Sequence, residues 1–219
     1  MSTETTERTV SRRDFLKGAI TVAGLTLVGG AGALLSGCQS QQTSNQTQPA
    51  VTWPFPYKKL DPAKVAERAY NKYKEAGCGY GAVDAIIGTL ADQYGEPYKF
   101  FPTKACILMA SGFTQNSLCG AIGGAAIAVG LLCDDKTGKE IIGDLIRWYK
   151  NNPFPAYQPA KLGLPTSVAN SDLCRDSING WLKVAGVTLD DPKRKERCGG
   201  LTADVAAKTV ELLNAKLIK

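Results

Sequence analysis

The stretch LCGAIGGAAIAVGLLC at residues 118–133 decides the fold. It contains no charged side chain, it is rich in glycine and alanine, and it is long enough for about four helical turns. We predict that it forms a fully buried helix against which the other elements pack. Gly120, Gly123 and Gly124 each cost this helix about 1 kcal/mol relative to alanine. Close approach of another backbone or of a bulky inorganic group would account for these glycines, and so would the packing of small residues alone.

Helical patterns flank this run on both sides. The first begins at Asp61 and Pro62, which suit the start of a helix, and ends at Gly77. Further helices are expected at residues 78–95, 103–113 (short and buried), 137–151, 173–185 and 199–217, and a Pro-rich loop at 151–166. The sequence therefore predicts an all-α domain at residues 53–219. We expect a compact helical bundle of about six to seven helices, with strands at most in the loops.

Four of the helical patterns begin with a cysteine, namely Cys78, Cys119, Cys174 and Cys198. A helix N-terminus presents free N–H groups and a partial positive charge, which stabilise a thiolate and lower the pKa of a cysteine. If the four helix ends converge, their thiolates can bind an iron–sulfur cluster of the 2Fe-2S or 4Fe-4S type. Glycines beside these cysteines would let the helix ends approach the cluster: Gly120, Gly123, Gly199 and Gly200.

Disulfides are the alternative use of the cysteines. Apart from Cys38 the chain has six cysteines, an even number that could form disulfides. Two of them, Cys106 and Cys133, lie in apolar runs and are either separate core residues or a disulfide pair. Paired cysteines would cycle between thiol and disulfide, or would staple the fold without a metal. The spacing alone favours neither use. A third interpretation, a lipoprotein that binds a small ligand or partner, rests on the aromatic and proline segments at residues 53–57 and 153–157.

The chain contains no histidine, which excludes several classes of site. A Ser-His or Cys-His nucleophile, a His-ligated zinc or copper ion, and Cys-x-x-Cys-His haem attachment all need one. No catalytic grouping of Ser, Asp and Glu is recognisable, so whether the protein is an enzyme stays open. The net charge is +6. Because the basic residues are scattered along helical faces and form no cluster, we expect no nucleic-acid partner. Asp84, Arg175 and Asp204 lie near the cysteine-bearing helix starts, and solvent exposure would account for each of them.

The N-terminal segment has the pattern of an export signal. SRRDFLKG at residues 11–18 places Arg12 and Arg13 before an uncharged stretch, as in a twin-arginine signal. LLSGC ends at Cys38 and resembles a lipobox, so we expect residues 1–37 to be removed and Cys38 to be lipidated. An uncleaved membrane anchor is the alternative, because about 20 apolar residues can span a bilayer. A polar linker at residues 38–52 would then tether the domain at the outer face of the cytoplasmic membrane or in the periplasm.

Four short motifs carry a resemblance to a known family. They are CGAIGG at residues 119–124, AGCGYGAVDAI at 76–86, DLCRDSI at 172–178 and RCGGLTADVAA at 197–207. With them the chain resembles, over about residues 75–213, the redox-active family called C_GCAxxG_C_C. The resemblance extends to the split-Soret cytochromes c, which combine a cluster-bearing helical region with covalently attached haems. This chain departs from them because it has no Cys-x-x-Cys-His motif, and no haem is expected.

The resemblance implies a helical protein with a redox centre bound by Cys78, Cys119, Cys174 and Cys198. Our leading interpretation is an exported, membrane-tethered iron–sulfur protein that transfers electrons to or from a partner protein. By analogy with the cytochromes, the protein would form a homodimer with the glycine-rich helix at its interface.

Overall fold

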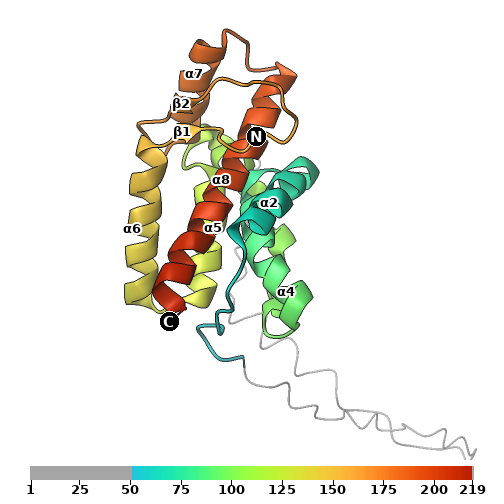
Figure 1. Ribbon diagram of the computed structural model, residues 1–219, viewed down its shortest axis with the longest axis vertical. Coiled ribbons are helices and arrows are strands. Elements are labelled where there is room, and N and C mark those ends of the chain that lie inside the picture. The colour runs from blue at the N-terminus through green and yellow to red at the C-terminus, as the bar shows by residue number, and fades with distance from the viewer. Residues whose placement is uncertain (1–50, 219) are drawn as a thin grey trace, which may run out of the picture. The chain divides into compact units, whose positions relative to one another are not determined.

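The computed structural model describes residues 51–218. These residues form seven α-helices and one short antiparallel ladder, so the all-α prediction is confirmed (Figure 1). The strands of the ladder, β1 (Pro153–Phe154) and β2 (Ser167–Val168), lie at the two ends of the Pro-rich loop. No helix within this range is both long enough and apolar enough to cross a membrane. The predicted signal, with Arg12, Arg13 and Cys38, lies outside the described residues.

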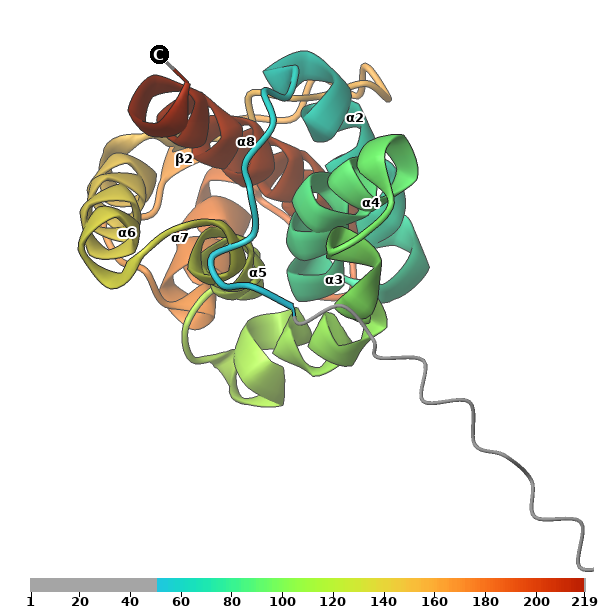
Figure 2. The same cartoon turned by 90° about the horizontal axis from the view of Figure 1, so that it is seen from below.

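The glycine-rich run forms α5 (Gly120–Leu132) at the centre of the bundle. Figure 2 shows α5 between α6 and α3, with α8 crossing over them, and α5 contacts all three helices. The first six residues of α5 are buried, as predicted. Gly130 is exposed, however, so the second half of the helix has one face in solvent and the helix is not buried throughout.

The chain enters the bundle through α2 (Pro62–Ala76), and the predicted cap is present. The Asp61 carboxylate accepts a hydrogen bond from the Ala63 N–H at 2.9 Å. Gly77 ends this helix with a φ of 88°, a value that a residue with a side chain rarely adopts, and α3 (Cys78–Val83) begins at the next residue. The predicted helix at residues 78–95 continues through the π-helical segment η1 (Asp84–Gly88) into α4 (Thr89–Tyr94).

The segment predicted as a short buried helix at residues 103–113 differs from the prediction. It forms the 3₁₀ segment η3 (Thr103–Met109), followed by the π-type turn η4 (Gly112–Asn116), and a further 3₁₀ segment, η2 (Tyr98–Phe100), precedes it. In η3 only Cys106 is buried, and the Leu108 side chain is 70% exposed. The segment lacks an N-cap, and it is too short for its apolar residues to share one face of an α-helix. It therefore forms the tighter 3₁₀ helix.

The second half of the chain supplies three longer helices. In α6 (Asp135–Asn151) the side chains of Ile141, Leu145 and Tyr149 recur at every fourth position and are buried. After the ladder come α7 (Cys174–Ala185) and α8 (Pro192–Leu217). The last helix starts seven residues earlier than predicted, because Asp191 accepts a hydrogen bond from the Lys193 N–H at 2.8 Å and Pro192 fills the first helical position.

Candidate redox centre

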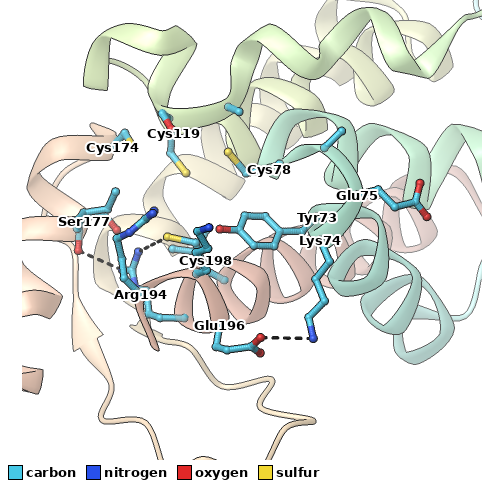
Figure 3. Close-up of a pocket in the computed structure, with 18 of the residues that line it drawn as sticks. Tyr73, Lys74, Glu75, Cys78, Cys119, Cys174, Ser177, Arg194, Glu196 and Cys198 are labelled. Carbon is cyan, nitrogen blue, oxygen red and sulfur yellow. Dashed lines mark hydrogen bonds and ion pairs between the residues drawn. The ribbon is translucent and has the colours of Figure 1, made fainter. Parts of the chain in front are cut away.

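Four cysteines from four different helices line one cavity of about 440 Å³. Figure 3 shows Cys174, Cys119 and Cys78 along one side of this cavity, with Cys198 facing them from the other side. The sequence had singled out these same four residues. Cys106 and Cys133 are buried elsewhere, in the apolar core. All six described cysteines are free thiols in this structure.

A short backbone contact places Cys119 beside Cys174. The residues before α5 and before α7 pair as an antiparallel bridge between Leu118 and Leu173. The Cys119 N–H donates to the Asp172 carbonyl at 2.9 Å, and the Cys174 N–H donates to the Ser117 carbonyl at 2.6 Å. Two helix starts far apart in the sequence are thereby fixed side by side.

Cys78 is held against the same region by the turn after α2. Its Sγ lies 4.0 Å from the Met109 carbonyl oxygen. A methyl group on Gly120 would come within 2.6 Å of this sulfur and within 2.1 Å of the Met109 carbonyl oxygen. Gly120 therefore allows α5, α3 and η3 to meet at the cavity.

The other glycines expected to approach a cofactor pack against protein. A methyl group on Gly123 would lie 3.0 Å from the Phe113 ring, and one on Gly200 would lie 2.3 Å from the Tyr157 carbonyl oxygen. A methyl group on Gly199 would lie 3.1 Å from the Tyr70 and Tyr73 rings. Of the four glycines, only Gly120 is tied to a cavity cysteine by such a contact.

Cys198 does not stand at a helix start, contrary to the prediction. It lies in the second turn of α8, because that helix begins at Pro192. The other three cysteines stand at or directly before the first residue of their helices. Cys198 reaches the cavity because its position on α8 faces α2, whose Tyr73 points toward it (Figure 3).

Burial governs the thiol pKa values in this structure. It raises the pKa of Cys78 and of Cys119, and it raises the pKa of Cys174 to about 12. Charge on the neighbouring cysteines raises the pKa of each of these three further. The N–H groups of Ala121 and Ile122 lower the pKa of Cys119, but by less than burial raises it. The expected net lowering by helix N-termini is therefore wrong for these three thiols.

A hydrogen-bonded chain connects two sides of the cavity. The Arg197 guanidinium donates to the Ser177 Oγ at 2.8 Å and lies 3.8 Å from the Cys198 Sγ. The Tyr149 and Ser177 hydroxyls share a hydrogen bond at 3.1 Å, and a hydrogen bond from Tyr149 lowers the pKa of Cys119. No sequence pattern singled out Arg197, Ser177 or Tyr149. The four-residue spacing from Ile141 to Tyr149 could have placed Tyr149 on the buried face of α6.

The three polar residues noted near the helix starts have different environments. Arg175 is exposed, as expected. Asp84 is buried, and its carboxylate pairs with Arg68 at 2.8 Å and accepts from the Thr103 hydroxyl at 2.7 Å. Asp204 accepts from the N–H groups of Ala156 and Tyr157 at 2.8 and 2.9 Å. Burial raises the pKa of Asp204 to about 6. For Asp84 and Asp204, solvent exposure is thus the wrong explanation.

Two comparisons with characterised proteins agree with one another. The chain is 35% identical over 225 residues to the split-Soret cytochrome c of Desulfovibrio desulfuricans, covering 95% of this chain and 79% of the relative. A solved structure described as a novel iron centre in the split-Soret cytochrome c from Desulfovibrio desulfuricans matches with a TM-score of 0.70 and 36% identity. That match covers 74% of this chain and 71% of the other.

These relatives correct the cofactor prediction. We expected an iron–sulfur cluster and no haem, but the relative is a cytochrome c, which is a haem protein, and its structure is described by a novel iron centre. The prediction was therefore wrong. Its physical weakness is that thiolate ligands are common to several iron-containing groups, so a pattern of cysteines identifies donor atoms and leaves the bound group undetermined.

The family comparison covers most of the cavity. Residues 80–212 match the family described as "Putative redox-active protein (C_GCAxxG_C_C)", a span that includes Cys119, Cys174 and Cys198 and begins two residues after Cys78. Together with the cytochrome relative, this match supports a role in redox chemistry or electron transfer. The chain belongs to the C_GCAxxG_C_C family of redox-active proteins.

Proposed function

We propose that this protein transfers electrons through an iron centre bound by Cys78, Cys119, Cys174 and Cys198. The observation that carries the proposal is the convergence of these four thiols, from four helices, on one cavity. A family of redox-active proteins and a relative with an iron centre support the same conclusion.

The residues around the cavity fit a thiolate-bound metal centre. Thiolates are soft ligands that suit iron, and Cys78 and Cys119 belong to the packed core, which keeps water away from them. The buried cation of Arg197 lies beside Cys198 and favours negative charge there. Within residues 51–218 no three candidate ligands lie close enough for a single metal ion.

An iron centre bound there would supply a one-electron redox couple. The protein's own residues would hold it and set its surroundings. Buried thiols with raised pKa values are protonated at neutral pH, so binding of the metal would release protons from them. Cys198 is half-buried whereas the other three cysteines are buried, which makes the α8 side of the cavity the side where electrons would enter or leave.

The first experiment measures iron per chain in the full-length protein purified without oxygen, together with its visible spectrum. We expect bound iron in the wild type and loss of most of it on Cys119→Ser or Cys174→Ser. The matched controls are Cys106→Ala and Cys133→Ala, which change cysteines outside the cavity and should keep the iron. Acid-labile sulfide and haem assays on the same samples would report the composition.

Wild-type protein without iron, even after anaerobic reconstitution, would overturn the proposal. Intact mass without reductant then distinguishes the thiol–disulfide alternative, since each disulfide removes two hydrogens. An equal loss of iron in the cavity variants and in the two controls would mean that the iron is not held at this cavity.

A second part of the proposal concerns location. The twin-arginine pattern with Arg12 and Arg13, and the lipobox that ends at Cys38, support export and attachment to the outer face of the cytoplasmic membrane. A redox protein tethered there would exchange electrons with a partner protein on the same side of the membrane.

A further inference from the structure

Arg197 is the most deeply buried charged residue beside the cavity. Its side chain is 1% exposed although it follows directly on the charged sequence PKRKE. One terminal nitrogen donates to the Ser177 carbonyl at 3.2 Å and to the Ser177 Oγ at 2.8 Å, and the other lies 3.8 Å from the Cys198 Sγ. The guanidinium is thus fixed by α7 and directed at a cavity cysteine.

No carboxylate neutralises this buried cation. Among the described residues Arg197 forms no ion pair within 4.0 Å, and its Nε is buried without a hydrogen-bond partner. Asp204 is close enough for Arg197 to lower its pKa, but its two oxygens accept from the N–H groups of Ala156 and Tyr157. A buried charge without a counterion is costly, by several kcal/mol in typical cases. The structure therefore indicates that a negative charge belongs next to Arg197.

The contacts of Arg197 extend to a second cysteine. Ser177 Oγ accepts from Arg197 and shares a hydrogen bond with the Tyr149 hydroxyl, and Tyr149 in turn interacts with the Cys119 thiol. Cys198 and Cys119 lie on opposite sides of the cavity in Figure 3. One buried cation thus connects to both sides of the proposed centre through fixed polar groups.

We propose that Arg197 is a positioning residue that supplies the internal positive charge balancing the thiolate-bound centre and, through Ser177 and Tyr149, fixes the orientation of Cys119 and Cys198. This inference rests on the proposed function. Reduction adds negative charge to the centre, so a fixed cation stabilises the reduced state more than the oxidised state. Arg197 therefore raises the reduction potential.

The first test measures the midpoint potential of the iron-loaded, full-length protein. In Arg197→Met the equilibrium constant for one-electron reduction should fall at least tenfold, which corresponds to about 59 mV. Arg197→Lys keeps the charge and should recover most of the wild-type potential. Lys195→Met is the matched control, because Lys195 is on the same helix and also lines the cavity, but it is exposed to solvent.

The second test compares thermal stability with and without iron. Without iron, Arg197→Met removes an unbalanced buried charge and should leave the melting temperature unchanged or raise it. With iron bound, the same substitution should lower the melting temperature relative to the wild type. A residue needed only for packing would shift both temperatures in the same direction. This comparison also applies if the methionine variant binds iron too weakly for a potential to be measured.

The outcomes separate this inference from the proposed function. Wild-type protein that binds no iron contradicts the proposed function. Wild-type protein that binds iron, with Arg197→Met at the wild-type potential or with Arg197→Lys shifted as far as Arg197→Met, overturns the role of Arg197 and leaves the proposed function standing.

Discussion

At the scale of single residues, Gly120 controls how closely three segments approach the cavity. A Cβ at this position would lie 2.1 Å from the Met109 carbonyl oxygen and 2.6 Å from the Cys78 Sγ. Neither neighbour can move easily, since one is backbone and the other is a buried side chain. We expect Gly120→Ala to destabilise the fold by about 1–3 kcal/mol and to displace Cys78. Urea unfolding and iron content measure the two effects.

The same helix provides the control for this substitution. Gly130 is exposed in α5, and a Cβ there would meet nothing within 4 Å. Gly130→Ala should therefore stabilise the protein by about 0.5–1 kcal/mol through the higher helix propensity of alanine. Equal stability of the two variants would contradict the assigned packing role of Gly120.

The identity of the cavity cysteines could be predicted from the sequence, but their electrostatics could not. Three of them stand at helix starts, which the capping and glycine patterns reveal. The pKa of a thiol depends on burial by distant segments, and burial outweighs the local N–H groups at Cys78 and Cys119. Arg197 was missed for a similar reason, because charged runs usually face water, whereas this side chain is buried and donates to Ser177 of α7.

At the scale of elements, the start of α8 determines how Cys198 reaches the cavity. Asp191 caps the helix through its hydrogen bond to the Lys193 N–H at 2.8 Å. We expect Asp191→Ala to lower the free energy of unfolding by about 1 kcal/mol, a typical cost for a lost N-cap. Urea unfolding provides the measurement. The neighbouring Asp190→Ala is the control, since Asp190 is exposed, and a matching loss there would contradict the capping role.

Elements with caps were predictable, and elements shaped by tertiary contacts were not. Both α2 and α8 begin with an Asp N-cap followed by Pro at the first helical position, at Asp61 and at Asp191. The second of these helix starts was not predicted, because the basic residues after Pro192 resemble a polar loop. The segment that begins at Ser111 gives no local signal for its backbone. Ser111, Phe113 and Thr114 have φ values of 54°, 55° and 61°, which are strained for residues with side chains. The segment packs against η3 and α7, contacts that only the folded chain provides.

At the scale of the whole molecule, the export proposal can be tested separately from the site. Replacing Arg12 and Arg13 together by lysine should leave the full-length precursor in the cytoplasm, as cell fractionation would show. Arg8→Lys, outside the motif, should be exported normally. Unchanged export of the double variant would contradict use of the twin-arginine route.

Lipidation has its own measurement at the same scale. Cys38→Ser should abolish the added lipid mass and leave residues 1–37 attached. A wild-type protein that carries no lipid and keeps residues 1–37 would favour the uncleaved anchor instead.

The origin of the four thiols in four separate helices also has a consequence for biosynthesis. A ribosome makes Cys78 first and Cys198 last, and α8 carries both Cys198 and Arg197. Until residue 198 is translated, the growing chain holds three of the thiols and lacks the one that faces them. The complete four-thiol cavity therefore forms late in synthesis, and a centre that needs all four thiols would be assembled after α8 has been made.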